Sequence, residues 1–222
     1  MSGGERLSRE AVARRVAAEL EDGDYVNLGV GLPTLVAGYV DPSKTVVFHA
    51  ENGILGFGPA ARPGEEDPDL FDAGFRHVTL RPGAAVVDGP TSFAIIRGRH
   101  LDVAVLGGLQ VSERGDLANW MRPERGVGSV GGAADIARGA RRVYVAMEHT
   151  TRDGGLRIVR RCTYPLTAVE AVHAIFTDVA VIRVTAGGLV LEEAAPGWSV
   201  DAVQAITEPR LTVSPAFREM TV

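Results

Sequence analysis

The residue best placed for chemistry is Glu51, which follows a run of β-branched and aromatic residues from Thr45 to Phe48. Such a run predicts a buried strand, so the carboxylate is expected at the end of a strand. Asn52 and Gly53 come next and are typical of a tight turn, in which glycine lets a bulky ligand approach the main-chain N–H groups. One carboxylate beside open backbone suits acyl chemistry. The same residues would also suit a plain polar turn between two core segments.

A second glycine-rich stretch follows the strand expected over 25–28, where Gly29 and Gly31 precede a helix expected over 33–40. Backbone donors at such a helix start suit an anionic or carbonyl group, although the glycines would also serve a simple tight turn. Asn27, at the end of the strand, either directs its amide into a cleft or caps the turn.

The third glycine-rich stretch runs from Gly126 to Gly132 and leads into a helix expected over 133–140. Its letters match G-x-G-x-x-G, but the preceding segment 122–125 has the chemistry of a turn and not of a strand, which argues against a dinucleotide fingerprint. The better interpretation is a backbone nest, with Gly131 and Gly132 at the N-terminus of the helix.

Other kinds of catalytic centre find little support in the sequence. No G-x-S-x-G elbow or P-loop is present. Cys162, the single cysteine, is interpreted as a small core residue; it excludes an internal disulfide and fits a reducing compartment. The histidines lack metal-ligand spacing, so each is interpreted as a satisfied or exposed side chain, and no metal is expected. They are His49, His77, His100, His149 and His173.

The composition indicates a globular protein. The chain has 222 residues, of which 45% are hydrophobic, so one domain over 1–222 can bury a sizeable core. The net charge of −5 argues against a nucleic-acid partner. No apolar run approaches the roughly 20 residues of a membrane span, and the polar residues 1–6 lack a signal-peptide pattern. We therefore expect a cytoplasmic protein that binds neither nucleic acid nor membrane.

Strand and helix patterns alternate along the chain, which predicts an α/β fold: a mostly parallel open sheet with flanking helices and antiparallel hairpins. The expected helices cover residues 7–20, 33–40, 133–140, a segment near 169–175, and 199–207. The expected strands cover residues 25–28, 45–48, 77–80, 84–87, 101–106, 143–147, 179–184 and 189–192.

Several motifs, in this order, resemble one known family over nearly the whole chain. The segment 49–56, His-Ala-Glu-Asn-Gly-Ile-Leu-Gly, is similar to the glutamate signature of the B subunit of 3-oxoacid CoA-transferases, the family I enzymes of the succinyl-CoA:3-oxoacid and 3-oxoadipate type. The other matching segments are 27–33, 92–98, 115–120, 131–133, 147–150 and 165–167.

The resemblance implies a CoA-transferase-like fold and a covalent ping-pong mechanism. Glu51 would attack the thioester of an acyl-CoA, such as succinyl-CoA, and become a glutamyl-CoA thioester before CoA passes to a 3-oxo or related acid. The substrate-binding and oxyanion positions implied by the matching motifs are Asn27, Gly29, Gly31, Asn52, Gly53, Gly131 and Gly132. CoA and acyl-CoA would be substrates, with no permanently bound cofactor.

The family also implies a partner, a CoA-transferase A subunit that supplies much of the CoA site in an A2B2 hetero-oligomer.

Some residues depart from the family pattern, and these departures alter the residues expected to determine substrate specificity. Phe75 stands where a lysine is expected, Arg99 where a glycine is expected, Ala134 where a methionine is expected, and 123–125 where Pro-Gly-Lys is expected. The sequence does not name the acceptor acid.

Three other functions remain open at this stage. An acyl-CoA hydrolase on the same scaffold would use water as the acceptor. A non-catalytic metabolite-binding domain would use the fold without the chemistry. A nicotinamide-dependent oxidoreductase rests only on the isolated G-x-G-x-x-G match.

Overall fold

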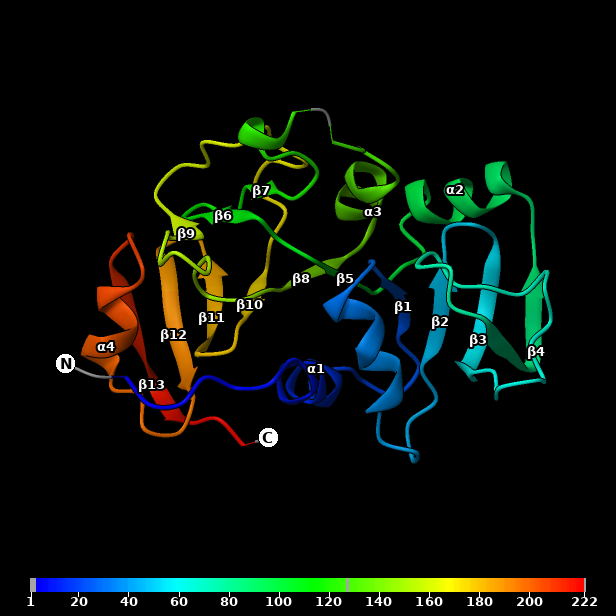
Figure 1. The fold of residues 1–222 in the computed structure, drawn as a ribbon, viewed down its shortest axis with the longest axis horizontal. Helices are drawn as coiled ribbons and strands as arrows, with labels where there is room; N and C mark the ends of the chain where they lie inside the picture. Colours follow the sequence, from blue (N-terminus) through cyan, green and yellow to red (C-terminus); the bar gives the residue numbers. More distant parts are fainter. Residues whose placement is uncertain (1–2, 127, 222) are drawn as a thin grey trace.

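The computed structural model describes residues 3–126 and 128–221, and its main feature is a ten-stranded mixed sheet (Figure 1). The strand order is β13-β12-β11-β10-β8-β5-β1-β2-β3-β4. The strands are β1 (Tyr25–Leu28), β2 (Val47–Ala50), β3 (Ile54–Ala60), β4 (Val78–Val86), β5 (Val103–Leu106), β8 (Arg142–Ala146), β10 (Ala174–Phe176), β11 (Ala180–Thr185), β12 (Gly188–Ala194) and β13 (Leu211–Glu219).

The remaining elements cover this sheet. The α-helices are α1 (Arg9–Ala18), α2 (Gly89–Arg97), α3 (Ala133–Gly139) and α4 (Val200–Ala205). Two 3-10 helices are η1 (Leu32–Gly38) and η2 (Pro123–Arg125). A small second sheet has the order β7-β6-β9, formed by Leu117–Ala118, Gln110–Ser112 and Ile158–Val159.

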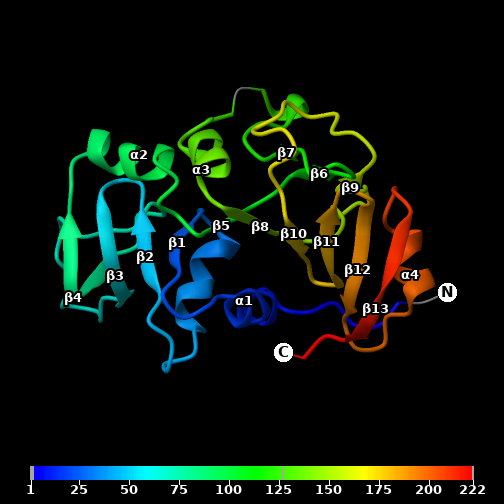
Figure 2. The same ribbon diagram turned by 180° about the vertical axis from the view of Figure 1, so that it is seen from behind.

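The centre of the large sheet is parallel, and its flanks are mixed. Strands β2, β1, β5, β8 and β10 run parallel, whereas β3 and β4 continue the sheet antiparallel on one side and β11 and β12 on the other. Strand β13 pairs parallel with β12, and Figure 2 shows β4 and β13 at opposite ends of the sheet. The expected α/β class with a mostly parallel open sheet and antiparallel hairpins is therefore confirmed.

Each face of the sheet carries its own hydrophobic core. Strand β5 shows why, because side chains alternate between the two faces of a strand. Val103 and Val105 pack into the core shared with α1 and η1, while Ala104 and Leu106 pack into the core shared with α3 and the small sheet. Figure 1 shows α1 on one side of the sheet and α2 and α3 on the other.

Most of the expected elements are present. The first helix is α1, whose N-cap residue Ser8 accepts a hydrogen bond from the Ala11 N–H through its side chain. Strands β11 and β12 form the expected hairpin, and Ser199 caps α4 by accepting from the Ala202 N–H.

Two expectations about local structure are wrong. The two short strands expected over 77–87 form one strand, β4, because pairing with β3 through bulges carries it across the supposed turn. The helix expected near 169–175 does not form in this described segment, and Ala174–Phe176 instead forms β10 between β8 and β11. In both cases a tertiary contact overrides the local pattern. The helix expected to begin near Pro33 is present as the 3-10 helix η1.

Two deeply buried histidines predict a specific pH dependence of stability. His149 hydrogen-bonds Thr177 and Thr207, each at 2.9 Å. Burial lowers the pKa of His149 and of His49 to about 4. Both are therefore neutral when folded, whereas the unfolded chain protonates them near pH 6.5. Stability should fall as the pH drops from 6.5 towards 4, by about 2 kcal/mol per histidine at pH 5.

Urea unfolding at pH 7 and pH 5 measures this effect, with His149→Gln as the comparison. The variant should lose about 2 kcal/mol of the difference between the two pH values, because one buried neutral histidine is gone. Equal pH dependence in the two proteins would contradict the prediction. The carboxylates add little to this pH dependence above pH 5, because the pKa of Glu19 and of Glu193 is lowered. Burial alone would raise the pKa of both groups, but hydrogen bonds from arginine side chains outweigh that effect.

Candidate active site

Glu51 lies in the tight connection between β2 and β3. Ala50 pairs with Ile54 across the antiparallel strands, and the Gly53 N–H donates to the Ala50 carbonyl over 2.9 Å. Residues 51–53 are therefore held from both sides by strands of the sheet. The Gly53 φ of +118° suits glycine, and a Cβ there would lie 2.2 Å from the Val87 carbonyl oxygen.

The register of two neighbouring parallel strands places an amide beside the carboxylate. Asn27 on β1 lies opposite His49 on β2, so their side chains share one face of the sheet, and Glu51 follows immediately after β2. The Asn27 Nδ2 group lies 3.2 Å from Glu51 Oε2, from His49 Nδ1 and from the His49 carbonyl oxygen. Asn27 is fully buried, so its amide is a fixed donor next to the carboxylate.

Two residues that were not among the predicted site residues support this amide. His49 is buried, and its Nε2 lies 3.0 Å from the Oγ of Ser92, a buried residue of α2. Since the ring is neutral, an Nδ1 that accepts from Asn27 leaves the proton on Nε2, which then donates to Ser92. We call Ser92, His49, Asn27 and Glu51 the polar chain of the site.

A cavity of about 520 Å³ opens beside Glu51, at the carboxyl ends of three adjacent parallel strands. Gly29 follows β1, Glu51 follows β2, and Gly107 follows β5. The chain moves from β1 to β2 on one side of β1 and returns to β5 on its other side, so this is a switch point of the sheet. Open α/β sheets bind their ligands at such a point.

The structure brings together most of the predicted site residues. Gly29, Glu51, Gly131 and Gly132 all line the cavity. Gly131, with φ of +53°, and Gly132 come immediately before α3, as the nest interpretation requires. The described element immediately before this stretch is η2, which ends at Arg125, and not a strand. Val127, which falls within the G-x-G-x-x-G match, lies outside the described residues.

The other predicted positions shape the surrounding loops. Asn52 is exposed, and its Nδ2 donates to the Phe71 carbonyl over 2.7 Å. Gly53 fixes the turn, and Gly31 precedes η1 with φ of +94°. None of these three residues is among those that line the cavity in the described part of the chain.

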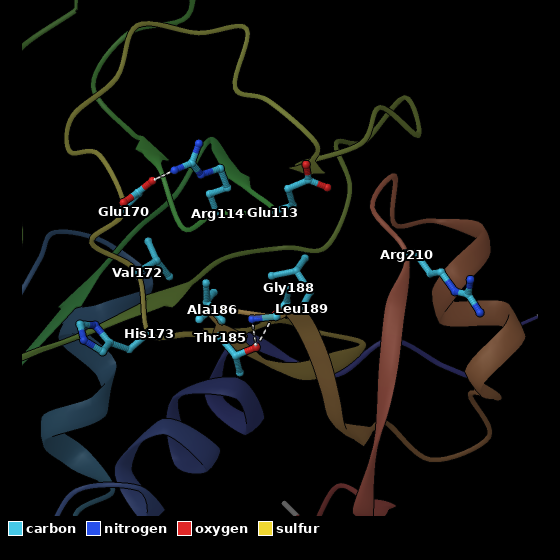
Figure 3. Close-up of a pocket in the computed structure, with 12 residues that line it drawn as sticks. Glu113, Arg114, Glu170, Val172, His173, Thr185, Ala186, Gly188, Leu189 and Arg210 are labelled. Carbon is cyan, nitrogen blue, oxygen red and sulfur yellow. Dashed lines mark hydrogen bonds and ion pairs between the residues drawn. The ribbon is translucent and has the colours of Figure 1, made fainter.

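A larger groove of about 850 Å³ lies between the β11–β12 hairpin and the loops that carry Arg114 and Glu170 (Figure 3). Two of the charged side chains that line it, Arg114 and Glu170, form an ion pair. Thr185 donates to the Gly188 carbonyl over 2.7 Å. The described residues that line this groove are all different from those that line the Glu51 cavity, so the two are separate sites.

Two other features bear on the chemistry. Burial raises the pKa of the Cys162 thiol to about 11, so this side chain is protonated at neutral pH and is a poor nucleophile. Within residues 3–126 and 128–221, no three His, Cys, Asp or Glu side chains group together in a way that would hold a metal ion.

Comparison with known proteins identifies the class of protein. The profile of the coenzyme A transferase family matches residues 9–205, so the chain belongs to this family and is an enzyme of the CoA-transferase type. Within the family it is similar to B subunits. It is 50% identical over 203 residues to the B subunit of 3-oxoadipate CoA-transferase from Pseudomonas putida, covering 91% of this chain and 95% of the relative.

Two further relatives carry different names. The beta subunit of acetate CoA-transferase from Escherichia coli is 48% identical, over 93% of this chain and 94% of the relative. The B subunit of succinyl-CoA:3-ketoacid coenzyme A transferase from Helicobacter pylori is 45% identical, over 92% of this chain and 99% of the relative.

Solved structures share the fold at low identity. An acyl-CoA transferase of Escherichia coli O157:H7 aligns with a TM-score of 0.77 at 21% identity, over 99% of this chain and 45% of that one. Glutaconate coenzyme A-transferase of Acidaminococcus fermentans aligns with a TM-score of 0.65 at 15% identity, over 99% and 91%. The decarboxylase AibA/AibB aligns with a TM-score of 0.68 at 21% identity, over 96% and 88%.

Among the helices of the described chain, none has the length and apolar character that crossing a membrane demands.

Proposed function

We propose that this chain is the B subunit that carries the covalent step of CoA transfer, from an acyl-CoA such as succinyl-CoA to a 3-oxo or related carboxylic acid. The observation that carries the proposal is the Glu51 carboxylate, held by Asn27 over 3.2 Å and facing a cavity that Gly131 and Gly132 also line.

The proposed reaction exchanges one acyl partner of CoA for another without water. A Glu51 oxygen attacks the thioester carbonyl of the donor, the C–S bond breaks, and a mixed anhydride and free CoA thiolate result. The thiolate attacks the glutamyl carbonyl and expels the donor carboxylate, which leaves a glutamyl-CoA thioester. The acceptor carboxylate then reverses these steps and regenerates Glu51. ATP is not required, because one thioester replaces another.

The residues around Glu51 supply what a weak nucleophile needs, namely positioning and stabilisation of negative charge. Asn27 holds one carboxylate oxygen and leaves the other to attack. We propose that the main-chain N–H of Gly131 or Gly132 stabilises the tetrahedral oxyanion. A Cβ at position 132 would lie 3.2 Å from the Phe93 ring, so glycine at this position avoids a tight contact with that ring.

Ser92 should act as a positioning residue through His49. In Ser92→Ala, His49 Nε2 loses its partner inside the protein, and the imidazole no longer fixes the Asn27 amide. We expect kcat for CoA transfer to fall roughly fivefold to tenfold with little change in KM, the size of one lost buried hydrogen bond. Thr91→Ala, at the exposed neighbouring position, is the matched control. A variant with normal kcat would show that the polar chain does not position Glu51.

The relatives are named as B or beta subunits, which supports a separate A subunit as the partner of this chain. We propose that the active enzyme is an A2B2 hetero-oligomer, that the A subunit completes the CoA site, and that no cofactor is permanently bound.

Mass spectrometry of the chain purified with its A partner tests the proposal. After mixing with succinyl-CoA or acetoacetyl-CoA, we expect a CoA adduct on the peptide that contains Glu51, removable by an acceptor acid. Free CoA that accumulates in water, without an adduct or an acceptor requirement, would instead indicate an acyl-CoA hydrolase. Absence of both an adduct and turnover across a panel of acyl-CoAs would overturn the proposal.

A further inference from the structure

Glu51 is the only charged side chain among the described residues that line its cavity. The other lining residues are glycines, apolar or aromatic side chains, and two neutral polar residues, Asn119 and Ser129. In the described part of this chain, the cavity lining therefore offers no cation to a second carboxylate on a substrate.

Two large apolar side chains that line this cavity are exposed, and a third, Phe75, is exposed on the loop that follows the lining residue Ala73; we call the three the apolar rim. Val30 and Val130 line the cavity and are 64% and 48% exposed. Phe75 is 83% exposed and lies two residues after Ala73, another lining residue. A Cβ on Gly74, between them, would lie 3.9 Å from the Val30 Cγ1 atom, so the Phe75 loop packs beside Val30.

The loop that carries Phe75 is fixed by hydrogen bonds. Asp72, which is 3% exposed, accepts from the N–H groups of Gly74 and Arg76 over 2.9 and 3.0 Å. Phe75 has φ of +60°, which is uncommon for an aromatic residue, and its ring stacks on Phe71 at 5.7 Å. Phe71 in turn accepts from the Asn52 side chain, next to Glu51. The exposed ring is thus connected to the catalytic turn.

The nearest cation in this loop is already engaged. The Arg76 guanidinium forms an ion pair with Asp72 at 3.0 Å and donates to the Thr34 carbonyl over 3.4 Å. The loop therefore presents an aromatic ring to solvent and holds its positive charge against its own carboxylate.

We propose that the apolar rim receives the distal end of the acyl group, so that this site prefers donors and acceptor acids whose distal end is uncharged over dicarboxylic ones. The inference rests on the proposed function, because it assumes that the acyl group is transferred at Glu51. A distal carboxylate placed on the apolar rim would lose hydration and gain no positively charged partner from the lining residues described above. Among the acyl-CoA donors considered under the proposed function, those whose acyl group has an uncharged distal end are favoured over succinyl-CoA.

The test compares two four-carbon donors, butyryl-CoA and succinyl-CoA, with the enzyme purified together with its A partner. We expect kcat/KM for formation of the Glu51 adduct to be at least about tenfold higher with butyryl-CoA. Phe75→Lys should reduce this ratio about fivefold by improving use of succinyl-CoA, the gain typical of one exposed ion pair. Val213→Lys is the matched control, because it adds the same charge at a 42% exposed apolar position on β13, at the far end of the sheet.

Three results would overturn the inference. The first is equal or better use of succinyl-CoA than of butyryl-CoA by the unmodified enzyme. The second is a butyryl-CoA to succinyl-CoA ratio that Phe75→Lys changes no more than Val213→Lys does. The third is loss of the A partner in Phe75→Lys, which would show that the apolar rim is a contact between the two subunits. A different result, no Glu51 adduct with any donor, would overturn the proposed function itself.

Discussion

Glu51→Gln is expected to reduce CoA transfer by at least about 10⁴-fold, because removal of a covalent nucleophile eliminates the pathway instead of slowing one step. Glutamine is nearly isosteric and still offers an oxygen to the Asn27 amide. The fold, the thermal unfolding midpoint and association with the A partner should therefore be preserved. Steady-state transfer rates and mass spectrometry of the Glu51 peptide measure the loss of turnover and of the CoA adduct together.

The matched control is Glu65→Gln, which makes the same change at an exposed position of the loop after β3. It should keep full activity. Near-normal transfer by Glu51→Gln would show that the covalent assignment is wrong. A variant that loses transfer but also unfolds would be set aside in favour of Glu51→Asp. That variant retains the charge but shortens the side chain, so it should be folded and strongly impaired.

Gly53→Ala is expected to destabilise the protein by roughly 3 kcal/mol or more, through backbone strain and a direct clash. The residue has φ of +118°, and the added Cβ would lie 2.2 Å from the Val87 carbonyl oxygen. The Val87 N–H also donates to the Gly53 carbonyl over 2.8 Å, so relief of the clash would disturb this bond. Thermal unfolding should show a midpoint lower by at least about 6 °C.

Gly64→Ala separates the two causes. Gly64 has φ of +86°, but nothing lies within 4 Å of an added Cβ. It should therefore cost only the conformational penalty of about 1 kcal/mol. Similar losses of stability in the two variants would show that the turn after Glu51 adapts to a side chain, and that the close approach to Val87 does not add to the cost of Gly53→Ala.

The sequence predicts a candidate site at Glu51 and the α/β class of the sheet. A strand pattern, a turn and repeated glycine come together at Glu51, but a plain polar turn fits them equally well, and its role as nucleophile is what the resemblance to 3-oxoacid CoA-transferases implies. The alternating elements indicate a mostly parallel sheet. The order of strands was not accessible, because it depends on contacts between distant segments. Strand β4 illustrates this limit: its local Arg81-Pro82-Gly83 sequence indicates a turn, but pairing with β3 keeps the chain extended.

The polar chain behind Glu51 could be recovered only in part. His49 stands two residues before Glu51, but its contact with Asn27 depends on the register of β1 and β2, which no local pattern gives. The partner Ser92 lies 43 residues further along the chain, and no local pattern connects it with His49. Two departures from the family pattern also gain a physical description. Arg99, where a glycine was expected, has φ of +61°, a conformation that suits glycine, and Phe75 has φ of +60°.

The short connection from β2 to β3 has a kinetic consequence. Glu51, which carries CoA in the proposed cycle, lies in the tight turn closed by the pairing of Ala50 with Ile54. It therefore cannot move from one cavity to a second one. Donor and acceptor must therefore occupy the same cavity in succession. Each substrate in excess should then act as a competitive inhibitor of the other, and double-reciprocal plots should show parallel lines that curve upward at high concentration of either one.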